Sequence, residues 1–309
     1  RASGVCHISS GFYVINDVYF METVRIIPRL DIKGPNVVKG IHLEGLRVVG
    51  RPDAMARYYY EKGADELFFQ DVVASLYERN SLDEIISKTA REIFIPLMVG
   101  GGLRTIEDIS RALHAGADKV CLNTAAIKNP NIIKQASRAF GSSTIVVAIE
   151  AIREPNSKYL AYTDNGREHT GIDVFDWAKT IEDLGAGEIV VTSVDREGTG
   201  EGFAIDLLRP IAETASIPVI AHGGAGNAND LVKVIKQGQA DAVTVASILH
   251  YEYIRSYTST YASKAEGNIE FLNSRRSFHN FDVSSIGDIK QAMDQASIPV
   301  RLGGNLQDS

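Results

Sequence analysis

The chain alternates between short apolar runs and longer segments whose apolar residues recur at the spacing of an amphipathic helix. Short apolar runs of this kind are typical of buried strands. They occupy residues 24–31, 66–71, 93–102, 119–124, 145–150, 188–195, 217–224 and 242–247. Segments such as "TIEDISRALHAGA" and "DVFDWAKTIEDLGAG" lie between them and predict helices. Eight strands that alternate with helices indicate an α/β fold with a parallel sheet.

The length of the repeating part favours a closed barrel over an open sheet. With about 250 residues in this part, we predict a (β/α)8 TIM barrel. An open doubly wound sheet is the alternative, but its usual G-x-G-x-x-G after the first strand is missing from this chain.

An internal repeat strengthens the prediction of a barrel. The aligned segments are "KGADELFFQD" (62–71) with "LGAGEIVVTS" (184–193), "IPLMVGGG" (95–102) with "IPVIAHGG" (217–224), and "GADKVCLNTAAI" (116–127) with "QADAVTVASIL" (239–249). Residues 24–140 and 144–250 are therefore predicted to be two half-barrels. Asp31 and Glu150 end the first strand of each half, so we expect them to face each other across the mouth of the barrel.

The two ends of the chain lack this regular pattern. Residues 1–20 have no long apolar core of a signal peptide, so we interpret them as a leader or a cloning remnant, or as a short extra strand covering one end of the fold. Residues 21–309 are predicted to form one domain. Within residues 251–309, the polar and irregular stretch 256–281 is predicted to be an excursion from the regular barrel pattern. A closing amphipathic helix is expected over 284–301, with an apolar face and an N-cap made by Ser284 or Ser285, the apolar residues being Ile286, Ile289 and Met293.

Composition and charge exclude several classes of protein. The net charge of −7 argues against general nucleic-acid binding. No apolar run reaches about 18 residues, so no transmembrane helix is expected. Cys6 and Cys121 are the only cysteines, which excludes a disulfide framework and a zinc ribbon and fits a reducing cytoplasm. Without an H-x-x-x-H or C-x-x-C motif, we expect no metal site.

Polar residues gather at the predicted carboxyl ends of the strands, which is where active sites of such barrels lie. These residues are Asp31, Asp71, Asn123, Glu150, Thr192, Asp195 and Glu197. Two carboxylates on opposite sides of a pocket can divide the roles of acid and base if their environments separate their pKa values. The alternative is that strand-end acids accept hydrogen bonds from the N–H groups of the following loops.

Two related glycine pairs predict phosphate sites. Each pair follows a strand and precedes a helix, and a hydroxyl residue ends the neighbouring strand of the same half. The residues are Gly101, Gly102 and Thr124 in the first half, and Gly223, Gly224 and Ser247 in the second. Glycine allows the backbone to approach an anion, and helix N-termini donate N–H groups to it. Two such sites suggest a long substrate with a phosphate at each end; the alternative is that the glycines only make tight turns.

The opposite ends of four strands also carry charge, at Arg25, Glu66, Lys119 and Glu188. Charges at the floor of a closed barrel are costly unless they are paired. A ring of two cations and two anions would neutralise itself, whereas an exposed rim is the alternative.

The motifs "RIIPRLDIK", "VVKG", "VGGGLRTIEDISRALHAGADKVCLNTAA", "GAGEIVVTSVDREGTGEGF", "IPVIAHGGAG" and "ASILHY" together resemble the cyclase subunits of imidazole glycerol phosphate synthase, over about residues 22–255. This resemblance implies an ammonia-dependent lyase of histidine biosynthesis that needs no cofactor. Its substrate would be the bis-phosphorylated phosphoribulosyl formimino derivative of aminoimidazole carboxamide ribotide. Ammonia would come from a partner glutaminase docked on the N-terminal face, through a gate formed by the charged ring.

The resemblance also implies roles for single residues. Asp31 matches the first of the family's two catalytic aspartates, and Lys39 and Asn123 match residues of the mouth. The two glycine sites match the family's two phosphate sites, and the resemblance adds Ala246 to the second of them. The second catalytic aspartate falls on Glu150, and Glu197 likewise stands where the family has aspartate. Each longer acid moves its carboxylate by about 1.5 Å, and a misplacement near 1 Å costs about 100-fold in rate. Arg29 replaces a residue that is usually small.

Two other functions stay open at this point. The first is a paralogue that binds a glutaminase and channels ammonia to another pathway, such as sugar amidation in surface polysaccharide synthesis. The second is the related phosphosugar isomerase of histidine biosynthesis, which the "VVKG" and "NTAA" segments and the gate residues fit less well.

Overall fold

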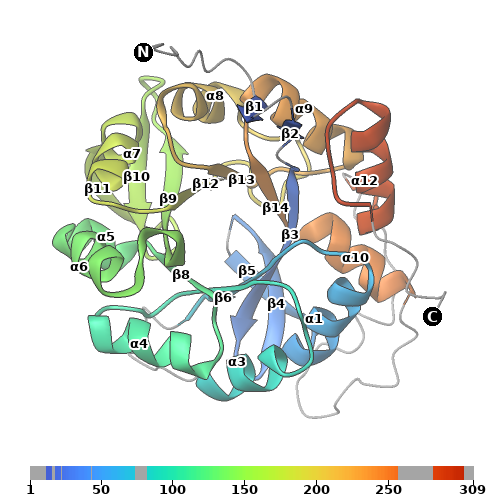
Figure 1. The fold of residues 1–309 in the computed structure, drawn as a ribbon, viewed down its shortest axis with the longest axis horizontal. Coiled ribbons are helices and arrows are strands. Elements are labelled where there is room, and N and C mark those ends of the chain that lie inside the picture. Colours follow the sequence, from blue (N-terminus) through green and yellow to red (C-terminus); the bar gives the residue numbers. More distant parts are fainter. Residues whose placement is uncertain are drawn as a thin grey trace.

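Eight parallel strands close into a barrel (Figure 1). The computed structural model describes residues 12–15, 18–21, 23–42, 44–73, 82–256 and 281–302. In the order in which they pair around the barrel, the strands are β3 (Arg25–Lys33), β6 (Leu67–Asp71), β7 (Leu97–Gly100), β8 (Lys119–Leu122), β9 (Ile145–Arg153), β12 (Glu188–Ser193), β13 (Val219–His222) and β14 (Ala242–Val245). Because β14 pairs with β3 in parallel, the sheet has no open edge along this ring. The (β/α)8 prediction is confirmed, and the open doubly wound sheet is excluded.

Two strands are at most half as long as their apolar runs predict. The runs 93–102 and 217–224 contain β7 and β13, which begin immediately after Pro96 and Pro218. Proline has no N–H to donate to the sheet, and its ring restricts the backbone of the residue before it. Each strand therefore begins at the residue that follows its proline. At the other end, Gly101 and Gly223 both have φ +92°, which turns the chain out of the strand.

Helices cover the outside of the barrel (Figure 1). They are α1 (Pro52–Glu61), α3 (Asp83–Ala90), α4 (Ile106–Ala115), α5 (Thr124–Lys128), α6 (Asn131–Phe140), α7 (Val174–Asp183), α8 (Ile205–Thr214), α9 (Ala228–Gly238), α10 (Ser247–Ser256) and α12 (Ile286–Gln295). Their apolar faces pack on the outward side chains of the strands and form the main core. Several begin at a side-chain cap; for example, Thr105 and Asp108 form a reciprocal capping box on α4.

The closing helix is shorter than predicted. Ser285 is its N-cap and forms a capping box with Asp288, whereas the hydroxyl of Ser284 bonds to the carbonyl of Asp282. The expected apolar residues Ile286, Ile289 and Met293 are buried, and α12 packs on α9. The excursion predicted at 256–281 lies, except for its first and last residues, outside the described part of the chain.

Sequence analysis did not predict the β-hairpins that extend the barrel. One consists of β4 (Asn36–Ile41) and β5 (Glu44–Gly50) and follows β3; the other consists of β10 (Tyr159–Thr163) and β11 (Glu168–Asp173) and follows β9 (Figure 1). They occupy equivalent places in the two halves, so the structure carries the internal repeat further than the sequence alignment did. Both hairpins project beyond the carboxyl ends of the strands and stand over the mouth.

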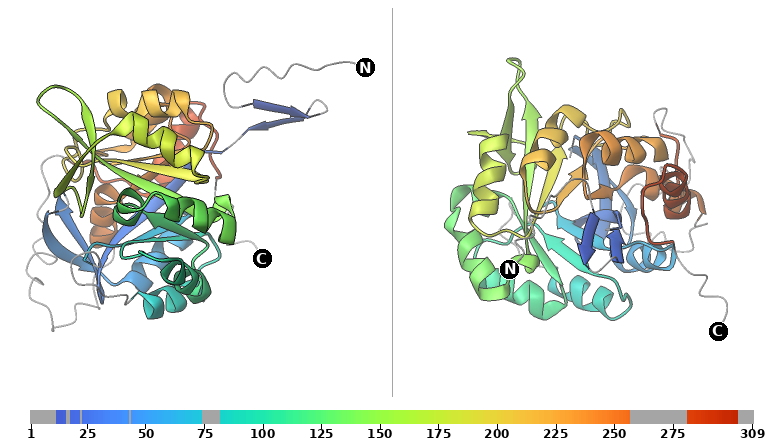
Figure 2. Two further views of the ribbon diagram at one scale, coloured as in Figure 1. Left: turned by 90° about the vertical axis from the view of Figure 1, so that its left-hand side faces the viewer. Right: turned by 45° about the horizontal axis from the view of Figure 1, so that its top comes forward.

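A third hairpin, β1 (Phe12–Ile15) and β2 (Val18–Met21), forms a separate two-stranded sheet. It stands apart from the barrel in Figure 2. The interpretation of residues 1–20 as a leader, a cloning remnant or a covering strand stays a prediction.

The barrel interior is arranged in layers along its axis. Along β3, every second side chain points inward: Arg25, Ile27, Arg29 and Asp31, from the floor to the mouth. The middle layer is apolar and is a cluster separate from the outer core. Its members are Ile27, Phe68, Met98, Cys121, Val146, Val190, Ile220 and Ala242. A dry layer therefore separates the charged floor from the polar mouth.

Replacement of Gly101 by alanine should destabilise the barrel more than the same change at Gly141. Both glycines have positive φ, +92° and +90°. A Cβ at Gly101 would lie 2.2 Å from the carbonyl oxygen of Asp71, whereas a Cβ at Gly141 would meet nothing within 4 Å. We expect G141A to lower the free energy of unfolding by about 1 kcal/mol from backbone strain alone, and G101A to lower it by about 3 kcal/mol because a backbone contact is added. Urea unfolding measures both; equal losses would contradict the steric argument.

Candidate active site

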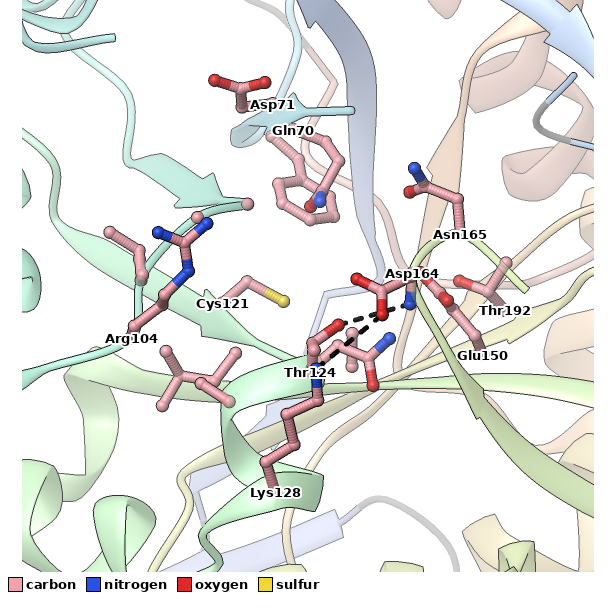
Figure 3. Close-up of a pocket in the computed structure, with 18 of the residues that line it drawn as sticks. Gln70, Asp71, Arg104, Cys121, Thr124, Lys128, Glu150, Asp164, Asn165 and Thr192 are labelled. Carbon is pink, nitrogen blue, oxygen red and sulfur yellow. Dashed lines mark hydrogen bonds and ion pairs between the residues drawn. The ribbon is translucent and has the colours of Figure 1, made fainter. Parts of the chain in front are cut away.

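A pocket of about 260 Å³ opens at the carboxyl ends of the strands (Figure 3). It contains seven of the residues that the sequence predicted for a site: Asp71, Gly101, Gly102, Asn123, Thr124, Glu150 and Thr192. The pocket does not reach Asp31, Lys39, Asp195, Glu197 or the second glycine pair with Ala246 and Ser247. The structure thus joins the first predicted phosphate site to Glu150 in one cavity and places the other predicted residues around it.

Asp31 is held by a buried arginine from its own strand. Arg29 Nε donates a hydrogen bond of 2.8 Å to Asp31 Oδ1, and the two side chains are 6% and 3% exposed. Burial alone would raise the pKa of Asp31, but the positive charges of Arg29 and Lys39 outweigh it and hold the pKa below its usual value. Asp31 is therefore ionised at neutral pH.

Glu150 has the opposite electrostatic character. Its carboxylate accepts a hydrogen bond of 2.9 Å from the N–H of Gly166, in the turn between β10 and β11. Burial raises its pKa to about 7, although the hydrogen bond from Gly166 and the charge of Arg29 both favour the ionised form. The two carboxylates thus have pKa values shifted in opposite directions, which is the pattern of a pair that divides acid and base roles.

Lys39 and Glu197 form a buried ion pair above the barrel. Lys39 comes from β4, and Glu197 comes from the turn after β12. The same contact is reinforced by the backbone, because the N–H of His42 donates to the carbonyl of Glu197 at 2.9 Å. Imidazole Nδ1 of His42 also lies 2.9 Å from the carbonyl of Val194. The hairpin β4–β5 is therefore fastened to the loop after β12.

The first glycine pair belongs to a cationic corner of the pocket. Thr124 begins α5, and its hydroxyl accepts a hydrogen bond of 3.3 Å from the N–H of Asp164. Arg104 and Lys128 line the same corner, and the ammonium of Lys128 lies 4.0 Å from the carboxylate of Asp164 (Figure 3). Sequence analysis missed both cations. The signal was present, since Arg104 stands two residues after the glycine pair and Lys128 stands one helical turn after Thr124.

The second glycine pair has the same backbone geometry. A Cβ at Gly223 would lie 2.6 Å from the carbonyl of Ser193, as one at Gly101 would lie 2.2 Å from that of Asp71. Both pairs therefore need glycine for close backbone packing, whatever else they bind. Ala246 and Ser247, at the start of α10, are buried beside this second site.

Like Glu150, two other strand-end acids accept hydrogen bonds from backbone N–H groups. Asp71 accepts one of 3.0 Å from the N–H of Val73 in the loop that follows β6, and Asp195 accepts one of 2.8 Å from the N–H of Arg153 at the end of β9. Thr192 is buried opposite Glu150 in the β12–β9 register. These contacts order the loops around the pocket.

At the opposite end of the barrel, the four charged residues form a closed ring of ion pairs. Arg25 contacts Glu66 at 2.8 Å and Glu188 at 3.1 Å, and Lys119 contacts the same two carboxylates at 3.0 and 2.9 Å. The side chain of Glu66 is 1% exposed and that of Arg25 is 24% exposed. The alternative of an exposed rim is therefore wrong: the ring is mostly buried and neutral in sum.

Two further kinds of site were sought among the described residues. No group of three histidine, cysteine, aspartate or glutamate side chains is arranged to hold a metal ion there. Along the same part of the chain, no helix has the length and apolar character that crossing a membrane requires.

Comparison with known proteins identifies relatives along most of the chain. Residues 25–255 match the sequence model of a family described as "histidine biosynthesis protein". A protein of Legionella pneumophila is 56% identical over 67% of this chain and 97% of its own length. Proteins of Alkaliphilus metalliredigens and Methanococcus vannielii are 45% and 47% identical, over 76% and 75% of this chain and 93% and 92% of their own lengths. All three relatives are named imidazole glycerol phosphate synthase subunit HisF.

Replacement of Glu150 by glutamine should change how stability depends on pH. The pKa of Glu150 is about 7 in the folded protein against 4.5 for the free side chain. The folded state therefore binds the proton more tightly, and the wild type loses stability as the pH rises from about 4.5 to about 7. We expect E150Q to unfold like the wild type near pH 4.5 but to be about 3 kcal/mol more stable near pH 8. Urea unfolding across this range measures the difference, with E213Q on the exposed face of α8 as the control. A constant difference between E150Q and the wild type at all pH values would contradict a raised pKa.

Proposed function

Because the chain belongs to the histidine biosynthesis protein family, we propose that it is the cyclase subunit of an imidazole glycerol phosphate synthase. The observation that supports this proposal most strongly is that the two ends of the barrel hold different sets of charged groups. A ring of ion pairs closes the floor, and two carboxylates with oppositely shifted pKa values stand at the mouth. The similarity to relatives named as this subunit, over nearly all of their own length, supports it. Neither the contacts of the site nor the relatives favour the alternative of ammonia delivery to another pathway.

The substrate in this proposal is the bis-phosphorylated formimino compound. The corner of Gly101, Gly102 and Thr124, with the nearby Arg104 and Lys128, holds one phosphate. The site of Gly223, Gly224, Ala246 and Ser247 holds the other, across the mouth. The two halves of the repeat thus bind the two ends of a long substrate, and its reactive centre lies between Asp31 and Glu150.

Ammonia reaches this centre along the barrel axis. It enters through the ring of Arg25, Glu66, Lys119 and Glu188 and crosses the apolar middle layer. A neutral ammonia molecule crosses an apolar layer readily, whereas an ammonium ion does not. The layers therefore deliver the nucleophile in its reactive form.

The two carboxylates then serve different steps. Ammonia attacks the ketone carbon of the ribulosyl chain, and the ionised Asp31 accepts the proton that the new bond to nitrogen makes acidic. Asp31 returns this proton to the former ketone oxygen, which takes a second proton from the nitrogen and leaves as water. The same nitrogen then closes on the formimino carbon. Glu150, with a pKa of about 7, supplies the proton that the departing aminoimidazole carboxamide ribotide takes. The products are imidazole glycerol phosphate and that ribotide.

A glutaminase partner docks on the end of the barrel that carries the charged ring. On this face, Phe94 precedes β7 and is 83% exposed beside a groove that Ile93, Pro96 and Gly116 also line. An aromatic side chain of this exposure is a strong anchor for a protein partner. We place the complex in the cytoplasm, where the other enzymes of the pathway would supply the substrate.

Turnover with external ammonia tests the catalytic proposal without a partner. The purified protein is given the formimino substrate and an ammonium salt at about pH 8.5. We expect imidazole glycerol phosphate to form, with a loss of kcat of at least about 100-fold in D31N and in E150Q. Absence of turnover in the wild type under these conditions would contradict the proposed function, and full activity of E150Q would remove Glu150 from the mechanism.

Binding of the glutaminase tests the docking face. We expect F94D to weaken the complex by about 2 kcal/mol or more, or about 30-fold in Kd, without changing turnover with ammonium salt. Phe175 offers a matched control, because it is 38% exposed but lies in the first turn of α7, at the mouth end of the barrel. F175D should bind the glutaminase normally, as measured by titration calorimetry. Equal weakening by both substitutions would contradict docking on the charged-ring face.

A further inference from the structure

Arg29 is a buried cation whose two Nη nitrogens have no partner within the part of the chain that the structure describes. The residue is 5% exposed and lines the pocket at the mouth. Its Nε bonds to Asp31, but neither Nη nitrogen makes a hydrogen bond to any described residue. These two nitrogens carry four of the five N–H groups of the guanidinium. Neither is among the fully buried polar atoms that lack a partner, so both remain accessible where Arg29 lines the pocket. The pocket is where these nitrogens can find an acceptor.

The surroundings hold the guanidinium in one place. Its carbon Cζ lies 5.4 Å from the centroid of the Phe68 ring, which belongs to the apolar middle layer. Asp31 fixes it from the mouth side, and the charges of Glu197 and Glu150 attract it as well. The barrel thus presents a rigid, preorganised cation immediately above the layer through which ammonia would arrive.

This position separates Arg29 from the groups that bind phosphate. The first phosphate corner has its own cations, Arg104 and Lys128, and the glycine backbone. Arg29 comes instead from the same face of β3 as Asp31, two residues deeper in the barrel. It therefore lies beside the middle of a long substrate, where the reaction occurs, rather than beside its charged ends.

We propose that Arg29 is a catalytic residue whose Nη groups bind the ketone oxygen of the phosphoribulosyl chain and stabilise the negative charge that develops there. This inference rests on the proposed function. When the lone pair of ammonia forms the new C–N bond, the C=O π electrons move to oxygen, and the two N–H groups of Arg29 receive that oxygen. Arg29 loses no proton in the step; the proton of the attacking nitrogen goes to Asp31, as above.

Two properties of the site support this role. Asp31 is ionised because Arg29 pairs with it, so it cannot itself donate a proton to the developing oxyanion. The positive charge that stabilises this oxyanion must therefore come from another group near the reacting carbon. The N–H groups on the Nη nitrogens of Arg29 are placed to supply it. Preorganised donors aimed at a developing oxyanion contribute about 100- to 1,000-fold in rate.

The competing explanation is that Arg29 only neutralises Asp31. A lysine at position 29 separates the two explanations, because it keeps a positive charge for Asp31 but cannot present the planar pair of N–H groups. If Arg29 only neutralises Asp31, R29K should keep the maximum kcat of the wild type, with at most a shift in the pH at which kcat changes. Binding of the oxygen predicts that kcat falls at every pH.

The experiment compares wild type, R29K and R29A at saturating substrate and fixed free ammonia, between about pH 6 and pH 9. We expect kcat of R29K to fall by about 100-fold across this range, while the substrate Kd, measured by calorimetry without ammonia, changes less than about threefold. R209K, an exposed arginine of α8 paired with Glu213, is the control and should match the wild type. An R29K enzyme with wild-type kcat would overturn the inference.

R29A gives a second test that does not depend on the folding of R29K. Guanidinium ion at millimolar concentration should restore part of the turnover of R29A, because it presents a planar pair of N–H donors. Methylammonium carries the same charge without that pair and should not restore turnover. Equal rescue by both ions would overturn the inference in favour of simple charge neutralisation. If the wild type neither binds nor converts the substrate, the proposed function and this inference are both overturned. If the substrate binds tightly and the variants have the kcat of the wild type, only this inference is overturned.

Discussion

Closure of the barrel is the constraint on which the rest of the molecule depends. Pairing of β14 with β3 leaves every second side chain of each strand inside a sealed ring. β3 alone sends two arginines and an aspartate into that interior. Charged groups inside a closed sheet are tolerated only when they are paired, so the positions of Glu66, Glu188 and Asp31 follow from the presence of those arginines.

The same constraint explains why the two ends differ although the strands are alike. At the floor, two cations and two anions pair with one another, and their formal charges sum to zero. At the mouth, the charges are distributed unequally: Lys39 is matched by Glu197, Asp31 is matched by one nitrogen of Arg29, and Glu150 is held by neutral donors, the N–H of Gly166 and the side chain of Asn123. The charged side chains at the mouth can act on a substrate because their pairing within the protein is incomplete.

Much of this arrangement could be read from the sequence. The eight runs, the repeat and the two glycine pairs predicted the barrel and its two-fold plan, because strand periodicity and close backbone packing leave strong local signals. The charged floor was also predictable, since each of its residues begins a strand. The hairpins after β3 and β9 were missed because residues 36–50 and 159–173 have mixed polarity and read as loops. The pairing of Lys39 with Glu197 could not be predicted either, because it joins a hairpin to a loop far away in the chain.

The substitution of a longer acid at position 150 is best understood together with Arg29. A glutamate carries its carboxylate about 1.5 Å further from the backbone than an aspartate does, and here that carboxylate accepts a hydrogen bond from the turn of the β10–β11 hairpin. Arg29, two residues deeper on β3 than Asp31, packs over the ring of Phe68 and attracts both acids. The two residues therefore support one another: the guanidinium lines the pocket below the acids, and the longer acid is held by the hairpin turn. A barrel with only one of them would leave either a buried cation with less counter-charge or a displaced carboxylate with less support.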